Sequence, residues 1–129
     1  MIYGIGTDIV SIERVQKILN KNRDGFINRV LTEHEKALFA NKADSAAFCA
    51  KRFAAKEAFS KAIGTGFREN LNFRDITVIN DKLGKPSFVV TDKIKKIVKK
   101  QFKISSFDFF LSISDEKKYS IAYVILQKK

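Results

Sequence analysis

The sequence predicts an α+β fold in which a mainly antiparallel sheet packs against a long central helix and shorter helices. An alanine-rich stretch without proline, residues 50–66, has the composition of a long helix. Two pairs of apolar runs, within 73–91 and 107–126, are each split by turn residues, as in β-hairpins. Because hairpins build antiparallel sheets, we expect the helices to lie across one face of such a sheet.

The chain of 129 residues is expected to form a single domain over 1–129 with a sizeable core. Its hydrophobic content of 45% and charged content of 30% are those of a globular protein. A formal charge of +11 indicates an anionic partner, which leaves nucleic acid, a phosphorylated ligand, an acidic protein and an anionic membrane open. Part of this charge can equally serve solubility.

The amino terminus, Met1 to Asp8, lacks a basic region and reaches a carboxylate too early for a signal peptide. No apolar run approaches the length of a membrane span, so we expect a cytoplasmic protein. The one cysteine, Cys49, has no histidine near it in sequence, which favours a buried structural thiol over a nucleophile.

Residues 2–12 begin as a strand, and their apolar side chains suggest burial on both faces. Asp8 is unexpected in such a run, because a buried carboxylate is costly unless it is paired, hydrogen-bonded or bound to a cation. A cap or turn aspartate near the strand end is the alternative interpretation. Gly4 and Gly6 interrupt the run and can mark a place where a ligand approaches the backbone.

Helical segments are expected after this strand. Ser11 is a suitable N-cap for a helix over 12–20. Residues 22–25 should break that helix before a short helical or irregular piece that carries Arg29.

A capping box, Thr32-Glu33-His34-Glu35, starts another helix that runs through Phe39. His34, the one histidine, lies at the exposed start of this helix, which favours a surface position over a catalytic one.

The stretch at 50–66 is expected to end at Gly64-Thr65-Gly66. A helical wheel gathers apolar side chains on one side: Phe48, Ala55, Phe59, Ala62 and Ile63. Glu57 and Lys61 share the opposite side, so we expect these two, with Ser60, to face a cleft or solvent. An amphipathic surface helix with an ordinary Glu57–Lys61 ion pair is the alternative.

The remaining elements follow in order. Strands at 76–79 and 87–91 form a first hairpin. An amphipathic helix over 92–102 carries lysines on its outer side, and such a lysine run is usually a solvated face. Strands at 107–113 and 119–126 form a second hairpin.

Two carboxylates differ from the solvated ones: Asp8 in an apolar strand and Glu57 on the polar side of the long helix. Together they can form an oxygen site for Mg²⁺, which takes one or two carboxylates together with waters and phosphate oxygens. Several nearby groups can hold phosphate: Arg52, Lys56, Lys61 and the backbone of Gly64-Thr65-Gly66. The pattern is neither a P-loop nor a Rossmann fingerprint, so phosphoryl chemistry remains one possibility among others.

A set of motifs runs through the chain in a fixed order: Ile5-Gly6-Thr7-Asp8-Ile9, Arg14, Phe26 with Arg29, Arg52 to Ala62, Gly64-Thr65-Gly66, Gly84-Lys85-Pro86 and Ser112-Ile113-Ser114. With these motifs the chain resembles the holo-[acyl-carrier-protein] synthases of the 4′-phosphopantetheinyl transferase family. The resemblance covers nearly the whole chain. Its most specific part is the Phe-Ala-Ala-Lys-Glu-Ala core paired with an amino-terminal Gly-x-Asp.

The resemblance implies transfer of 4′-phosphopantetheine from coenzyme A to a serine of acyl carrier protein, for fatty acid biosynthesis, with release of adenosine 3′,5′-bisphosphate. It implies that Asp8 and Glu57 hold Mg²⁺ on the pyrophosphate and that Lys61 neutralises the phosphate under attack. Glu57, acting through a water, is one candidate for the base. The family also implies a homotrimer with sites between subunits, and neither nucleic acid nor a membrane as partner.

Two further groups of residues are carried over from the resemblance. Those expected to bind coenzyme A are Arg52, Phe53, Lys56, Ser60, Gly64, Gly66, Gly84, Lys85 and Pro86. Those expected to dock the acidic carrier protein are Arg14, Lys21, Arg23, Phe26 and Arg29.

The chain departs from the family in the late hairpin. Family members commonly have histidine after Ser-x-Ser or Ser-x-Thr, whereas this chain has Asp115. If that histidine contacts the nucleotide, Asp115 must bind differently or weaken binding by placing negative charge near phosphate.

Two other functions stay open. The net charge and the lysine face of 92–103 fit a basic nucleic-acid-binding domain, although the phenylalanines resemble core residues more than a stacking platform. The missing histidine also leaves open a carrier-protein-binding module that has no catalytic activity.

Overall fold

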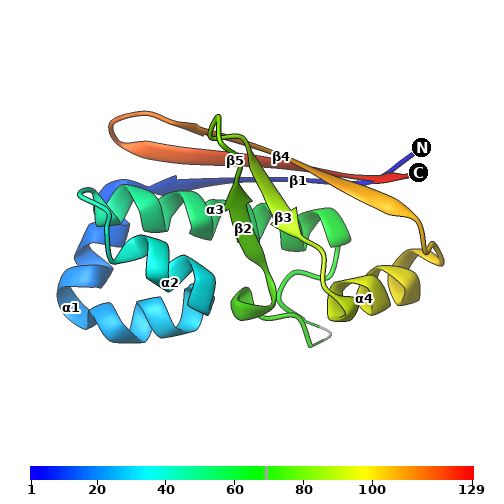
Figure 1. The fold of residues 1–129 in the computed structure, drawn as a ribbon, viewed down its shortest axis with the longest axis horizontal. Helices are drawn as coiled ribbons and strands as arrows, with labels where there is room; N and C mark the ends of the chain where they lie inside the picture. The colour runs from blue at the N-terminus through cyan, green and yellow to red at the C-terminus, as the bar shows by residue number, and fades with distance from the viewer. Residues whose placement is uncertain (69) are drawn as a thin grey trace.

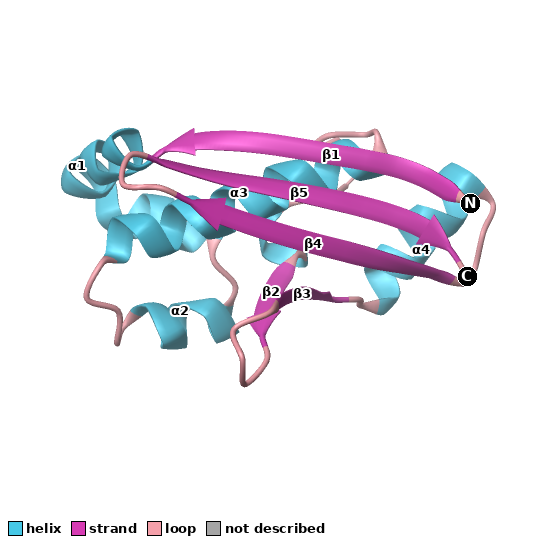
Figure 2. Cartoon of the chain, turned by 90° about the horizontal axis from the view of Figure 1, so that it is seen from above, coloured by secondary structure: helices cyan, strands magenta, loops and turns pink. Residues whose placement is uncertain are grey.

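The computed structural model describes residues 1–68 and 70–129 and has the expected α+β architecture. Three long strands form an antiparallel sheet in the order β1-β5-β4, with β1 at Ile2–Ser11, β4 at Phe107–Asp115 and β5 at Tyr119–Lys128. Figure 2 shows the three strands side by side, with the helices on one face. A smaller antiparallel pair, β2 at Thr77–Asn80 and β3 at Pro86–Val89, packs next to β4.

The long helix α3, Ser45–Ile63, runs along the inner face of the sheet (Figure 1). Asp44 caps its start by accepting a hydrogen bond from the Ala47 N–H at 3.1 Å. Its end lies at Gly64, whose φ of 90° is a left-handed conformation suited to glycine. The helix is buried on most of its circumference, so the alternative of an amphipathic surface helix is wrong.

Gly4 and Gly6 allow β1 to touch the backbone of α3. A Cβ on Gly4 would overlap the carbonyl oxygen of Ala62, and a Cβ on Gly6 would overlap that of Ala58. These two glycines therefore serve close packing of strand and helix, and the expectation that a ligand approaches the backbone here is wrong.

Gly6→Ala should lower the free energy of unfolding by about 3 kcal/mol, because the backbone of α3 cannot yield as a flexible side chain would. Urea unfolding measures the change. Lys17→Ala, at an exposed position of the first helix, is the control and should shift the midpoint little. Equal stability of Gly6→Ala and wild type would contradict the close contact.

Helix α1, Ile12–Val30, contains the expected break as a kink at Asn22, where φ is −151° and ψ is 73°. Ser11 caps it as expected, accepting from the Arg14 N–H at 3.3 Å. Helix α2, Glu33–Phe39, begins with the predicted capping box at Thr32 and Glu35. Both helices pack against the first half of α3 around a second apolar core.

Helix α4, Asp92–Phe102, has the predicted bounds, and its inward Ile94 and Val98 are fully buried. Thr91 accepts from the Ile94 N–H at 3.3 Å and so caps α4. Because Thr91 belongs to the helix cap, β3 ends at Val89, two residues earlier than expected. A short 3₁₀ helix, η1 at Phe73–Asp75, precedes β2.

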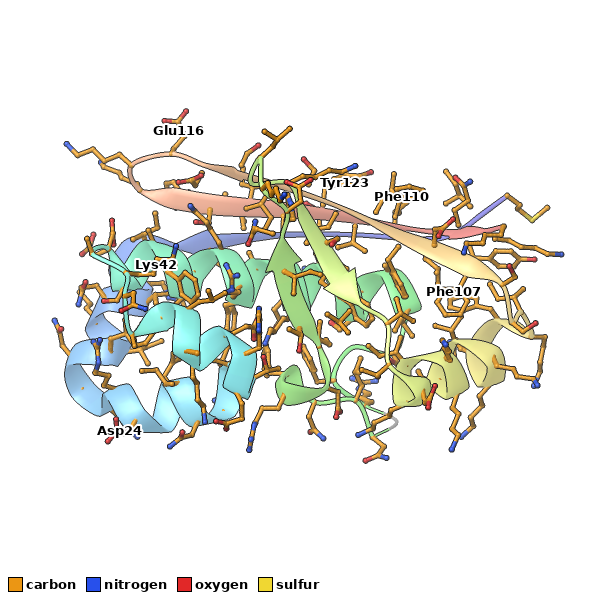
Figure 3. All side chains as sticks on the ribbon, in the orientation of Figure 1. Asp24, Lys42, Phe107, Phe110, Glu116 and Tyr123 are labelled. Atoms are coloured by element: carbon orange, nitrogen blue, oxygen red, sulfur yellow. The ribbon has the colours of Figure 1, made fainter. Side chains whose placement is uncertain are left out.

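The outer face of the large sheet is apolar and exposed within this chain. Ile5 and Ile9 are 57% and 60% exposed, and on the neighbouring strands Phe110, Ile121 and Tyr123 are also exposed. Figure 3 shows Phe110 and Tyr123 on the side of the sheet away from the helices. The expectation that both faces of β1 are buried is therefore wrong for a single chain, since helices cover one face alone.

The described helices include none that is both long and apolar enough to cross a membrane.

Candidate active site

Asp8 and Glu57 line one pocket, as the sequence predicted. This carboxylate pocket has a volume of about 330 Å³ between β1, α1 and α3, and Arg14, Phe26 and Phe53 also line it. Strand residues two apart point to the same face, so Asp8 continues the row of Gly4 and Gly6 along α3. The close strand–helix contact at Ala58 thereby brings the Asp8 carboxylate beside the helix turn that carries Glu57.

Lys61 holds Asp8 from the next turn of α3. Its ammonium donates to the Thr7 carbonyl oxygen at 2.9 Å and to Asp8 Oδ1 at 3.2 Å. The Asp8 side chain is largely shielded, whereas half of the Lys61 side chain is exposed. Lys61 can therefore turn toward an incoming anion without leaving the site.

Both carboxylates resist ionisation in this pocket. Burial raises the pKa of Asp8, and the Lys61 ammonium opposes that shift. Burial also raises the pKa of Glu57, the Asp8 charge raises it further, and Lys61 and Arg29 act in the opposite direction. A cation placed between the two carboxylates would relieve both burial and repulsion.

The donor set fits Mg²⁺. No group of three or more metal-ligating side chains occurs among residues 1–68 and 70–129. Mg²⁺ does not require such a group, because it commonly takes one or two carboxylates and completes its shell with water and phosphate oxygens. Asp8 and Glu57 are the residues that would hold it.

The five residues expected to dock a carrier protein lie around α1 but not in one place. Arg14 and Phe26 line the carboxylate pocket. Arg29 lies close enough to lower the pKa of Glu57 and packs over the Phe73 ring at 5.6 Å. Lys21 is exposed near the kink, and Arg23 packs over the Phe39 ring at 4.8 Å.

A larger hollow of about 860 Å³ lies between α2, α3, the β2–β3 turn and the end of β4. We call it the hairpin pocket, and Arg52, Gly84 and Pro86 line it as the resemblance led us to expect. Lys85 is exposed between the last two, with its N–H donated to Asp81 Oδ1 at 2.9 Å. Asp115, at the position of the family's histidine, lines this pocket.

Sequence reasoning overlooked three residues of the hairpin pocket. His34 is exposed, as predicted, but it also lines this hollow. Lys42 and Lys51 contribute two further cations. For Lys51 a signal existed, since it directly precedes the Arg52 to Ala62 motif.

Lys56 is a structural residue, so the expectation that it holds phosphate is wrong. The side chain is 0% exposed, and its ammonium bonds Glu35 Oε1 at 2.5 Å and the Val30 carbonyl oxygen at 2.6 Å. A third bond goes to the Phe73 carbonyl oxygen at 3.2 Å. The three N–H donors of the ammonium are thereby used inside the protein.

Arg52 shares the same buried carboxylate while keeping contact with the hairpin pocket. Its Nε lies 3.5 Å from Glu35 Oε2, and its Nη2 donates to Asn80 Oδ1 at 3.2 Å. Burial lowers the pKa of Arg52, and the Glu35 charge opposes the shift. Arg52 therefore ties α3 to α2 and to the β2–β3 hairpin.

Two other expectations about α3 are corrected. Ser60 is buried, and its hydroxyl donates to the Glu57 carbonyl oxygen at 2.7 Å, so it does not face a cleft. The N–H groups of Gly64 and Gly66 both donate to the Ser60 carbonyl oxygen, at 3.1 and 3.2 Å. These two amides close the helix end and are not available to a phosphate.

Cys49 is a buried structural thiol, as predicted. It is 0% exposed, and burial raises its pKa to about 12. The thiol thus stays protonated at neutral pH and lacks the thiolate that a nucleophile requires.

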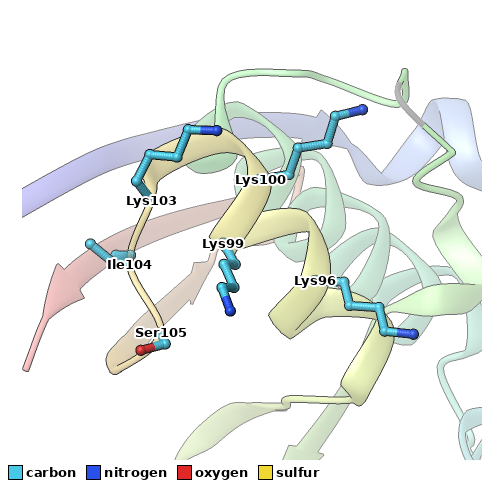
Figure 4. A pocket seen from close by; sticks show the side chains of 6 residues that line it. All are labelled: Lys96, Lys99, Lys100, Lys103, Ile104 and Ser105. Atoms are coloured by element: carbon cyan, nitrogen blue, oxygen red, sulfur yellow. The ribbon is translucent and has the colours of Figure 1, made fainter.

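A third hollow, about 450 Å³ in volume, lies at the end of α4 and is lined by Lys96, Lys99, Lys100, Lys103, Ile104 and Ser105. In Figure 4 the four lysine side chains point in different directions and do not converge on one point. Of the site residues predicted from the sequence, all of which the structure describes, none lines this hollow.

Comparison with known proteins agrees with the fold and shows the family. Residues 4–124 match the model of a family described as the 4′-phosphopantetheinyl transferase superfamily. The holo-[acyl-carrier-protein] synthase of Pelagibacter ubique is 73% identical over 128 residues, which span 99% of this chain and 98% of the relative.

Two solved structures extend the comparison. The synthase of Neisseria meningitidis has a TM-score of 0.89 and 44% identity, covering 99% of this chain and 100% of that one. The synthase of Bacillus anthracis in complex with CoA (3′,5′-ADP) has a TM-score of 0.81 and 37% identity, covering 100% and 99%. The chain belongs to the holo-[acyl-carrier-protein] synthase family of the 4′-phosphopantetheinyl transferase superfamily.

Proposed function

We propose that this protein transfers 4′-phosphopantetheine from coenzyme A to a serine of apo acyl carrier protein, for fatty acid biosynthesis. The products are holo acyl carrier protein and adenosine 3′,5′-bisphosphate. The main observation that supports this proposal is that Asp8 and Glu57 line the same pocket and that Lys61 donates a hydrogen bond to Asp8. The family membership and the coenzyme A complex of the Bacillus anthracis relative support the same reaction.

The reaction is Mg²⁺-dependent in this proposal, and Asp8 and Glu57 hold the ion. When bound, Mg²⁺ supplies positive charge against the pyrophosphate oxygens of coenzyme A. Lys61 contributes a second positive charge at the phosphate under attack, where negative charge grows in the transition state. Its half-exposed ammonium, anchored on Thr7 and Asp8, supports this role.

In the transfer step, the serine oxygen of the carrier forms a bond to the phosphorus that bears pantetheine. The bond from that phosphorus to the oxygen of the adenosine bisphosphate breaks, and the electron pair leaves with that oxygen. The serine proton goes to a base, for which Glu57 acting through a water is our candidate. Its raised pKa makes its carboxylate a better proton acceptor than an ordinary surface glutamate.

The working unit in our proposal is a homotrimer with sites between subunits. The exposed apolar residues on the outer sheet face, such as Ile5 and Ile121, need a partner surface. Among the described residues, the carboxylate pocket and the hairpin pocket share no lining side chain. A neighbouring copy can therefore complete one site by adding its hairpin pocket.

Sedimentation equilibrium tests the assembly. We expect a mass three times that of one chain, and Ile121→Lys should reduce it to one chain because the lysine would be buried without a partner. A wild-type protein that sediments as a single chain at assay concentrations would contradict the trimer.

Arg14→Ala should raise the KM for apo carrier protein about tenfold and leave kcat within about twofold, because one charge-assisted contact to the acidic partner is lost. Steady-state transfer rates at varied carrier concentration measure both constants. Lys95→Ala, on the exposed side of α4, is the control and should leave both unchanged. A fall in kcat with an unchanged KM would contradict a role of Arg14 in carrier binding and would indicate a role in the transfer step.

The function itself is tested by mass spectrometry of apo carrier protein after incubation with the protein, coenzyme A and Mg²⁺. We expect the carrier to gain the mass of phosphopantetheine and expect chelation of Mg²⁺ to stop the gain. A protein that binds the carrier without any mass increase would instead be a carrier-binding module.

We place the reaction in the cytoplasm. A single buried, free cysteine and a thiol-bearing donor molecule both suit a reducing compartment.

A further inference from the structure

Positive charge is concentrated on helix α4 and the two residues after its C-cap. Residues 92–105 contain six lysines and one aspartate, so they carry a net charge of +5 out of the +11 of the whole chain. Five of these lysines are exposed and form what we call the α4 lysine surface: Lys95, Lys96, Lys99, Lys100 and Lys103. None of the five is among the described residues that line the carboxylate pocket or the hairpin pocket, so the proposed transfer reaction leaves this charge without a role.

Helix stability does not explain the α4 lysine surface. Cations in the last turn of a helix interact favourably with its dipole, which accounts for Lys99 and Lys100. Lys96 lies nearer the start of α4, where the dipole does not favour a cation, and like charges three or four residues apart repel each other. Within the part of the chain that the structure describes, Lys96, Lys99 and Lys103 have no carboxylate partner to offset this repulsion.

The lysines diverge from the axis of α4. At about 100° per residue they spread over roughly 140° of the helix circumference. Lys95 and Lys99 lie on one flank, Lys96 and Lys100 lie on the other, and Lys103 lies between them. Figure 4 shows the last four of these side chains pointing in different directions. A small anion needs cations that converge on it, whereas this surface is a convex ridge with cations on both sides.

We propose that the α4 lysine surface binds duplex DNA without sequence preference, a partner that the family resemblance does not imply. The major groove of B-form DNA is about 12 Å wide and admits an α-helix. A row of phosphates borders this groove on each side. A helix that lies over the groove therefore needs cations on both flanks, and α4 has them.

The composition of α4 explains why the binding is independent of sequence. Residues 92–105 contain no arginine or asparagine, which are common readers of base edges. The one side-chain amide belongs to Gln101, and its Nε2 lies beside Gly64 on α3, away from the lysines. Contacts to phosphates remain, and these carry no sequence information.

Other polyanions fit the α4 lysine surface less well. A single strand needs aromatic rings on which its bases stack, but Phe102 is half-buried with its ring edge against Tyr3 at 5.8 Å. Duplex RNA has a narrow, deep major groove that does not admit a helix. A helix that lies in a membrane interface presents apolar side chains to the lipid, and the exposed residues of 92–105 are all polar or charged.

The position of α4 leaves this surface accessible while the enzyme works. Helices α4 and α1 lie at opposite ends of the molecule in both views (Figures 1 and 2). Helix α4 also lies on the helical side of the large sheet, opposite the apolar face that we assign to the trimer. DNA and carrier protein should therefore bind without competition, and the inference does not depend on the proposed function.

Fluorescence anisotropy with a labelled duplex of about 20 base pairs tests the inference at several salt concentrations. Each phosphate contact adds about 0.9 to the slope of log Kd against log salt concentration. Lys96→Gln, Lys99→Gln and Lys103→Gln, made together, should lower this slope by about 2.7 and raise the Kd at low salt about tenfold or more. Changing the base sequence of the duplex should alter the Kd of the wild type less than about twofold.

The matched control removes three exposed lysines from other elements, as Lys17→Gln, Lys82→Gln and Lys117→Gln together. This variant has the same net charge as the α4 variant, so it separates the site from the overall charge. Its salt slope should fall by less than about 1. The α4 variant should still transfer phosphopantetheine at the wild-type rate, because none of its three changed residues lines the carboxylate pocket.

Four results would overturn the inference. The wild type could fail to bind the duplex at low salt, or the α4 variant could bind it as tightly as the wild type. The control variant could lose as much affinity as the α4 variant, which would assign the binding to net charge alone. The wild type could also bind single-stranded DNA, duplex RNA or vesicles of phosphatidylglycerol more tightly than duplex DNA, which would assign the surface to that partner.

Discussion

Asp8→Asn and Glu57→Gln should each lower the rate of phosphopantetheine transfer by roughly 10²–10³-fold while the protein stays folded. Each change removes one of the two carboxylates that line the pocket and would hold Mg²⁺, and loss of one electrostatic group at a developing charge typically costs 10²–10³-fold. Single-turnover rates with saturating coenzyme A and carrier measure the effect. Asp108→Asn, a carboxylate paired with Lys129 on β4, is the control and should transfer at the wild-type rate.

Glu57→Gln should lower the transfer rate but should leave the stability of the folded protein unchanged or raise it. Because the folded-state pKa of Glu57 is raised, its favourable contribution exists at low pH and is lost as the pH rises through that pKa. At neutral pH the ionised carboxylate is then a cost that glutamine does not carry. We expect a melting temperature equal to or above that of wild type, and a large fall would assign Glu57 to the core instead of the site.

Lys56→Ala should lower the free energy of unfolding by roughly 3–5 kcal/mol, because it leaves the fully buried Glu35 carboxylate without its closest cation. It also removes the donor from the carbonyl oxygens of Val30 and Phe73. Urea unfolding measures the loss, and Lys56→Met separates the lost charge from the lost volume. Both variants should be strongly destabilised.

Lys51→Ala is the matched control for Lys56, since it lies on the same helix in a partly exposed ion pair. It should cost less than about 1 kcal/mol. A Lys56→Ala protein that is as stable as Lys51→Ala but fails to bind coenzyme A would restore the phosphate-binding role that the buried contacts exclude.

Features fixed by a few neighbouring residues could be predicted from the sequence. The N-caps at Ser11 and Thr32 and the glycine end of α3 occur where expected, because each depends on a side chain and a backbone within about one helical turn. Periodicity also identified the four helices and both hairpins.

Features that depend on distant residues could not be predicted in this way. A helical wheel gives the direction of Lys56 but not what covers it, and residues of α2 and η1 bond its ammonium inside the protein. Lys56 contacts Glu35, which lies 21 positions earlier in the chain, and no rule of residue spacing predicts that contact. The outer face of β1 has the apolar sequence of a buried surface although it is exposed in one chain, because in our proposal another copy of the chain covers it.

The candidate site lies between these two cases. Asp8 and Glu57 are 49 positions apart, and their unusual contexts in the strand and the long helix suggested a shared Mg²⁺ site, which the resemblance then made specific. The structure adds the physical reason for their meeting, which is the glycine-mediated contact of β1 with α3. It also removes Lys56, Ser60 and the amides of Gly64 and Gly66 from the groups that can hold phosphate.

A crystal structure of the protein with coenzyme A and Mn²⁺ in place of Mg²⁺ tests the central claim most directly, because the anomalous signal of manganese locates the ion. The account predicts one anomalous peak bonded to carboxylate oxygens of both Asp8 and Glu57 and to a pyrophosphate oxygen, with the Lys61 ammonium on the adjacent phosphate. Coenzyme A bound in full with the ion elsewhere, or with its pyrophosphate away from Asp8 and Glu57, would contradict it.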